Sequence, residues 1–112
     1  MKIADIVTAL DLNVFSGHKG LENEITGGYA SDLLSDVVGH AEKGNVWITL
    51  QTHRNILAVA SLKELSAVII VKGQQPAVDT MEKSNEENIP LLGTRGDTFP
   101  MAGKLYEILK DS

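Results

Sequence analysis

The chain contains no cysteine, which excludes disulfide bonds, thiolate nucleophiles and zinc-thiolate sites and leaves an iron–sulfur cluster without its usual ligands. Positive charge is scarce too: 10 Lys and Arg stand against 15 Asp and Glu, for a formal net charge of −5. Because a nucleic-acid backbone is bound mainly by clustered cations, we expect no nucleic-acid partner.

Long apolar runs are also absent. Runs such as Ala67 to Val71 are far shorter than the roughly 20 residues that cross a bilayer. The start, Met1 to Asp5, has an acid at its fifth position and no apolar signal-peptide region. We therefore expect a cytoplasmic protein without a membrane partner. With 112 residues, 43% of them hydrophobic, the chain can bury the core of one domain, and we take residues 1–112 as that domain.

Hydrophobic periodicity predicts an alternation of helices and strands. Helices are expected over 3–10, 33–41, 55–65, 76–87 and 98–110, and strands over 13–16, 46–50, 67–71 and 90–92. An extended segment, 24–32, is interrupted by Gly27-Gly28. Strands joined by helical crossovers favour a mainly parallel sheet. The fold class is therefore α/β, a three-layer α/β/α sandwich, in which 46–50 and 67–71 are neighbouring or next-but-one strands buried on both faces.

Several local features refine these elements. Ser31 or Asp32 is the expected N-cap of the second helix, and Pro76 is expected at the first position of the fourth. Asp97 or Thr98 should cap the last helix. Its expected core face is the set Phe99, Ala102, Leu105, Tyr106 and Leu109.

The stretch from Glu24 to Val37 resembles the DRTGG domain family, whose five-residue signature position is occupied here by Glu24-Ile25-Thr26-Gly27-Gly28. Thr26-Gly27-Gly28 is intact, whereas Glu24 and Ile25 replace the Asp and Arg of the signature. The similarity continues through 44–53 to the C-terminus and so covers nearly the whole chain.

The resemblance implies a fold like the N-terminal domain of HPr kinase/phosphorylase. It also implies a regulatory or assembly module without catalytic residues, because the family occurs beside CBS domains in regulated pyrophosphatases, where it contributes to dimer contacts. Stand-alone copies are often encoded near hydrogenase-type subunits, so a regulated enzyme or a redox complex is an implied partner. We expect a homodimer, in which Leu33 or Val37 of the broad apolar stripe 33–38 is left for the second copy.

Kinase chemistry is not expected. A P-loop needs G-x-x-x-x-G-K-[ST], but at the pair Gly103-Lys104 the first glycine is replaced by Thr98 and the hydroxyl residue by Leu105. The pair also falls inside a predicted helix. Nor does any nucleophile motif of the G-x-S-x-G type occur.

Ligands of open α/β sheets bind beyond the carboxyl ends of the strands, where helix N-termini present free amides. The turns there are polar and hold three cations, Arg54, Lys72 and Arg95, although ordinary turn chemistry explains such residues as well. We predict a site for a small anionic or nucleotide-like ligand at the 51–55 turn together with Thr26 to Gly28. The candidate ligand-binding residues are Thr26, Gly27, Gly28, Gln51, Thr52, His53, Arg54, Asn55, Lys72, Gly73, Gly93 and Thr94.

Metal binding and catalysis are the less favoured alternatives. His18, His40 and His53 are too widely spaced to form a ligand motif, so we expect no metal and no cofactor. Asp32 and Asp36 fall on one predicted helix face, where they either hold Mg²⁺ or stay solvated. Phosphoryl transfer or hydrolysis would need His53 as its base, and a structural accessory subunit of a hydrogenase-type complex would need none of these residues.

Overall fold

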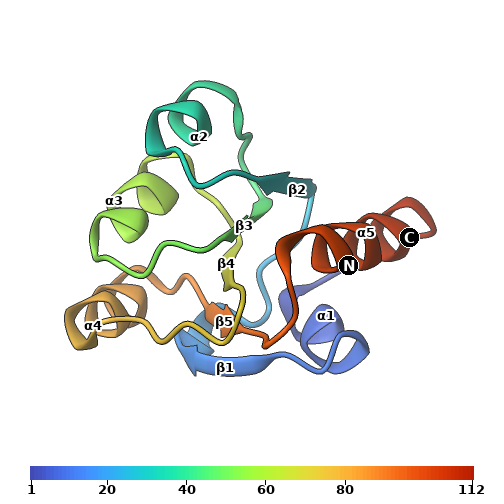
Figure 1. Ribbon diagram of the computed structural model, residues 1–112, viewed down its shortest axis with the longest axis horizontal. Coiled ribbons are helices and arrows are strands. Elements are labelled where there is room, and N and C mark those ends of the chain that lie inside the picture. The colour runs from blue at the N-terminus through green and yellow to red at the C-terminus, as the bar shows by residue number, and fades with distance from the viewer.

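Five strands form one sheet in the order β1-β5-β4-β3-β2, as the computed structural model of residues 1–112 shows (Figure 1). Strand β1 (Asn13–Ser16) runs antiparallel to β5 (Leu91–Gly93). The other strands, β2 (Gly27–Ala30), β3 (Asn45–Thr49) and β4 (Ala67–Ile70), run parallel to one another and to β5. The predicted mainly parallel α/β sheet is therefore confirmed.

Helices cover both faces of the sheet, which completes the predicted three layers (Figure 1). One face carries α2 (Leu34–His40), α3 (Asn55–Leu62) and α4 (Val78–Glu87). The opposite face carries α1 (Ile3–Ala9) and α5 (Thr98–Lys110). A single 3-10 turn, His18–Gly20, follows β1. None of the helices combines the length and apolar character needed to cross a bilayer.

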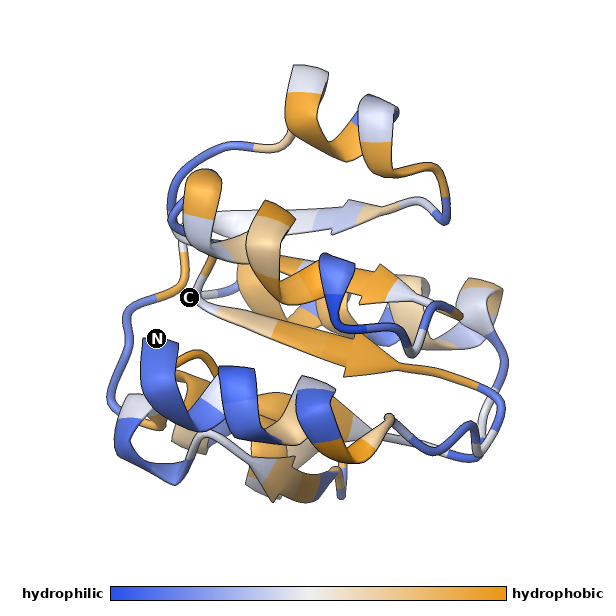
Figure 2. Cartoon of the chain, turned by 90° about the vertical axis from the view of Figure 1, so that its left-hand side faces the viewer, coloured by the Kyte–Doolittle hydropathy of each residue, from blue (hydrophilic) through white to orange (hydrophobic).

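The two hydrophobic cores lie on either side of the central strands. In β3 and β4, Trp47 and Val68 point to the layer of α2, α3 and α4, while Ile48 and Ile69 point to the layer of α1 and α5. All residues of these two strands are buried, and the central strands of the sheet are coloured mostly as hydrophobic in Figure 2. β3 pairs directly with β4, so the predicted adjacency of two doubly covered strands is confirmed.

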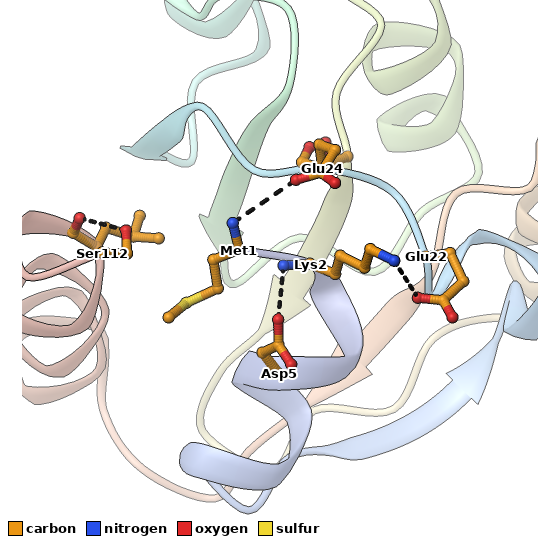
Figure 3. A network of polar contacts seen from close by, with 8 residues as sticks. Met1, Lys2, Asp5, Glu22, Glu24 and Ser112 are labelled. Atoms are coloured by element: carbon orange, nitrogen blue, oxygen red, sulfur yellow. Dashed lines mark hydrogen bonds and ion pairs between the residues drawn. The ribbon is translucent and has the colours of Figure 1, made fainter.

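The N-terminus is fastened to the segment that precedes β2 (Figure 3). The ammonium group of Met1 lies 3.6 Å from the Glu24 carboxylate, and Lys2 pairs with Glu22 at 3.5 Å. The Lys2 amide donates to Asp5, 2.9 Å away, at the start of α1. Burial of Ile3 and Ile6 holds α1 against the sheet, and the C-terminal end of the helix leads into β1 beside the end of β5.

Two predicted helix starts are wrong because tertiary contacts hold the preceding residues extended. Helix α2 begins at Leu34 without a side-chain cap. The two predicted caps are engaged elsewhere, because the Ser31 carbonyl accepts a bond from the Trp47 indole at 2.8 Å and the Asp32 carboxylate accepts one from the Leu50 amide at the end of β3. Helix α4 begins at Val78, not at Pro76, because the Ala77 amide donates to the Thr52 carbonyl at 3.3 Å.

The predicted core face of α5 is partly wrong. Met101 and Leu105 are its buried residues, and Ala102, Ile108 and Leu109 pack around them. Phe99 and Tyr106 are instead 88% and 68% exposed. The stripe at 101, 105 and 108 has regular helical spacing, and it turns the two aromatic side chains toward solvent. Asp97 does precede the helix, although its side chain makes no capping bond.

Candidate functional site

The carboxyl ends of β2, β3, β4 and β5 lie along the same edge of the sheet, called here the carboxyl edge, because these strands are parallel. The segments that follow β3, β4 and β5 therefore start at that edge, as predicted. They contain Gln51 to Asn55, Lys72 and Gly73, and Thr94, respectively. Asn13 joins them from the antiparallel strand β1, where it pairs with Gly93.

The connections diverge between β4 and β5. The chain leaves β4 for α4 on one face, whereas it leaves β5 for α5 on the opposite face (Figure 1). Connections that diverge in this way open a crevice between neighbouring strand ends, as at the topological switch points where open α/β sheets bind ligands, although the order β5-β4-β3-β2 itself does not reverse. The divergence thus singles out the turns after β4 and β5 from the other turns at the carboxyl edge.

A polar cleft of about 930 Å³ lies at this point, and we call it the switch-point cleft. It is lined by Leu10, Asp11, Asn13, Phe15, Lys72, Gly73, Gln74, Gln75, Gly93, Thr94, Arg95, Gly96 and Lys104. Its three cations, Lys72, Arg95 and Lys104, are exposed, and none lies within 4.0 Å of a carboxylate. Asp11 is its one acid. The cleft is therefore electropositive in a chain whose net charge is −5.

The floor of the cleft is built from backbone in an uncommon conformation. Lys72 and Gly73 are consecutive left-handed residues, with φ of 61° and 66°. Their amides donate to the carbonyls of Gly96 and Thr94, both at 2.9 Å, so the two turns are joined. The predicted free amides are therefore used within the protein here. An anion in this cleft would be bound mainly by side chains.

The turn after β3, which sequence reasoning favoured, already contains a carboxylate of the protein. Asp32 accepts hydrogen bonds from the Leu50 amide at 2.7 Å and from the Thr49 hydroxyl at 2.9 Å. The Gln51 amide turns back to the Thr49 hydroxyl at 3.2 Å, and the Thr52 carbonyl accepts a bond from Thr80 at 2.9 Å. Two amides that an external anion would need at this strand end, those of Leu50 and Gln51, are thus satisfied internally.

The pairing of this turn with Thr26 to Gly28 is wrong. Because β2 is parallel to β3 and Gly27 pairs with Asn45, these residues lie where the strands begin, at the opposite edge of the sheet. The Thr26 hydroxyl donates to the Lys43 carbonyl at 2.7 Å, a local structural bond.

Gly28 makes room for a helix. A Cβ atom there would lie 3.2 Å from Cδ2 of Leu105, and the backbone of Gly28 is not left-handed. An apolar groove of about 430 Å³, called here the β2 groove, runs between β2 and α5. It is lined by Gly27, Gly28, Tyr29, Ala30, Ile48, Ala102, Leu105, Tyr106, Leu109 and Lys110.

The acidic and imidazole groups considered for metal binding are dispersed. No three His, Asp or Glu side chains gather closely enough to hold a metal ion. Asp32 lies before α2 and Asp36 within it, so they do not share the predicted helix face. Hydrogen bonds from Ser31 and Tyr29, with a smaller contribution from His40, lower the pKa of Asp36. His40 lies 3.1 Å from that carboxylate.

Sequence reasoning placed Lys72, Gly73, Gly93 and Thr94 among the candidates but missed most of the other lining of the switch-point cleft. Lys104 belongs to a helix, and Asn13 and Phe15 to a strand far away in the sequence. Arg95 lies in a turn that was recognised as polar. No sequence signal shows that α5 crosses to the other face, which is what brings Lys104 to the cleft.

Comparisons with known proteins agree with this architecture. The family model described as the DRTGG domain matches residues 5–108. A similar solved structure is that of the CBS and DRTGG domains of the regulatory region of Clostridium perfringens pyrophosphatase, complexed with the activator diadenosine tetraphosphate. The similarity has a TM-score of 0.72 at 16% identity and covers 94% of this chain but 45% of that one. No curated protein matches. The chain thus belongs to the DRTGG domain family.

Proposed function

We propose that this DRTGG domain is a non-catalytic regulatory module that binds a small anionic, nucleotide-like ligand in the switch-point cleft. The observation that carries the proposal is the convergence of Lys72, Arg95 and Lys104, all without an acidic partner, on one cleft where the connections after β4 and β5 diverge. Cations held near one another repel, so a bound anion would relieve a cost that the free protein carries.

The similar pyrophosphatase region supports a regulatory role, since it is complexed with a nucleotide activator. That observation concerns a region that also contains CBS domains. The cleft alone therefore supports the position of the ligand in this chain.

Binding without turnover fits the cleft better than catalysis does. His53, the general base that an enzyme would need, lines a separate surface depression with Arg54, Asn55, Ala58 and Lys83. The switch-point cleft holds no histidine, and its one carboxylate has no base beside it to form an acid–base pair. These features favour recognition of a phosphate group over attack on it.

The test is calorimetric titration with ATP. The affinities of two cleft variants, Arg95→Gln and Lys104→Gln, are compared with those of two control variants, Arg54→Gln and Lys19→Gln. All four residues are exposed cations without an acidic partner, so the controls remove the same charge elsewhere. We expect the first pair to lower affinity about tenfold each and the controls to leave it unchanged within about twofold. Loss of binding in Arg54→Gln alone would place the site at the turn after β3, and no binding to the wild type would contradict the proposal.

We also propose that the domain forms a homodimer through the open edge of β2. This strand ends the sheet and has no proline, bulge or lysine to block pairing, whereas β1 at the other edge has an irregular register. Leu33, three residues after the end of the strand, is 64% exposed, and Tyr106 lines the β2 groove. Val37, the alternative contact residue, is fully buried and unavailable.

A second copy of the chain is the best partner for this exposed strand edge, because two identical edges can pair about a two-fold axis. Light scattering at tens of micromolar should return twice the 12.1 kDa chain mass. Tyr106→Glu should return the monomer mass, while Phe99→Glu, a matched change on the same helix outside the groove, should not. A wild-type mass of one chain would contradict the dimer.

A further inference from the structure

Phe99 is a large apolar side chain that the fold does not use. It lies in the first turn of α5, is 88% exposed, and belongs to neither hydrophobic core. Exposed single hydrophobic residues are common, so its position matters more than its exposure. Phe99 lines a second cleft, of about 930 Å³, between the end of α1 and the start of α5, which we call the aromatic cleft.

The aromatic cleft continues into the switch-point cleft. Leu10, Asp11 and Lys104 line both. A continuous surface therefore runs from an exposed phenyl ring at one end to the cations Lys72 and Arg95 at the other. A molecule that is planar and aromatic at one end and multiply anionic at the other would complement both ends.

The acids of this surface restrict the ligand further. Glu107 of the aromatic cleft pairs with Lys110 at 3.4 Å. Asp11, with no cationic partner, lines both clefts. A carboxylate there repels phosphate groups but accepts hydrogen bonds from hydroxyl groups. The part of the ligand next to Asp11 should therefore carry hydroxyl groups instead of phosphate groups.

We propose that Phe99 is a base-stacking residue for a nucleoside polyphosphate. The ribose of this ligand faces Asp11, and the phosphates bind Lys72, Arg95 and Lys104. This inference rests on the proposed anion site and deepens it by naming the chemical class and orientation of the ligand. Stacking on an aromatic face tolerates any base, so Phe99 contributes affinity for nucleotides over inorganic phosphates without selecting a base.

The experiment compares ATP with inorganic tripolyphosphate, which has similar charge but no base. Titration calorimetry is performed on the wild type, Phe99→Ala and the control Leu62→Ala, which removes another exposed apolar side chain, from α3 on the opposite face of the sheet. We expect the wild type to bind ATP more tightly than tripolyphosphate. Phe99→Ala should lose about tenfold in ATP affinity and leave tripolyphosphate binding unchanged, as alanine substitution of a stacking residue does.

The outcomes separate the two proposals. If tripolyphosphate binds as tightly as ATP, or if Phe99→Ala and Leu62→Ala have equal effects on ATP, base stacking is refuted while the anion site stands. If neither compound binds the wild type, both proposals fail. Phe99→Trp adds a direct readout, because stacking of a base should quench the exposed indole, and unchanged fluorescence on saturation with ATP would also refute stacking.

Discussion

Substitution of Gly28 tests why a glycine pair occupies an edge strand. The methyl group of an alanine would lie 3.2 Å from Cδ2 of Leu105 and 3.6 Å from the Val46 carbonyl oxygen. Because the nearer atom ends a flexible side chain and the backbone of Gly28 is not left-handed, alanine should change stability by less than about 1 kcal/mol. Valine adds two methyl groups to a Cβ atom that is already in tight contact.

Gly28→Val should therefore destabilise the domain by about 1–3 kcal/mol, the usual cost of overpacking. Leu105 is 2% exposed and has little free space into which to move. For a domain of this size the change corresponds to a fall in Tm of roughly 5 to 15 °C. Urea unfolding followed by the fluorescence of Trp47, which is fully buried, measures it. ATP affinity should be unchanged in the fraction that is folded, because Gly28 lies outside the switch-point cleft.

A double-mutant cycle identifies the contact. Leu105→Ala alone should cost about 2–5 kcal/mol, but it also creates the space that valine needs. The pair should therefore lose less stability than the sum of the single variants, by at least about 0.5 kcal/mol. Strict additivity, or a Gly28→Val variant as stable as the wild type, would refute the close approach of α5 to β2. Loss of ATP binding in a fully folded Gly28→Val would restore the glycine pair as part of a ligand site.

Three further outcomes are expected. Gly39→Ala in α2 should raise the free energy of unfolding by up to about 1 kcal/mol, since no atom lies within 4 Å of an added Cβ; a lower urea midpoint would contradict this. Asp32→Ala should cost about 1–2 kcal/mol by leaving the Leu50 amide without its acceptor, and an unchanged midpoint would show that water replaces the carboxylate. The pKa of Asp36 is lowered in the folded protein, first by its hydrogen bond from Ser31. This shift stabilises the fold at pH values above the unfolded pKa near 3.9, and the stabilisation is lost as pH falls below that value. The stability difference between wild type and Asp36→Asn should thus shrink between pH 7 and pH 3, and a constant difference would contradict the assignment.

Hydrophobic pattern alone predicted the layers of the sandwich and the two central strands. Ala67 to Ile70 and Val46 to Ile48 are apolar throughout, and such runs suit strands covered on both faces. The family resemblance on Thr26-Gly27-Gly28 was likewise sufficient to assign the chain to its family. The errors were local. An N-cap at Ser31 or Asp32 and a helix start at Pro76 follow from propensity in the sequence, but bonds to distant residues overrode both.

The sequence by itself determined which segments are helices and strands and that polar turns follow the strands, because periodicity and turn chemistry are local properties. Only the tertiary structure decided which turns share a cleft. The direction of β2 placed Thr26 to Gly28 at the far edge, and the position of α5 on the opposite face brought Lys104 into the same cleft as Lys72 and Arg95. Both depend on how whole elements pack, since the same local pattern is compatible with either face of the sheet. The exposure of Phe99 has the same origin: the orientation of α5, set by burial of Met101 and Leu105, determined which of its apolar residues point to solvent.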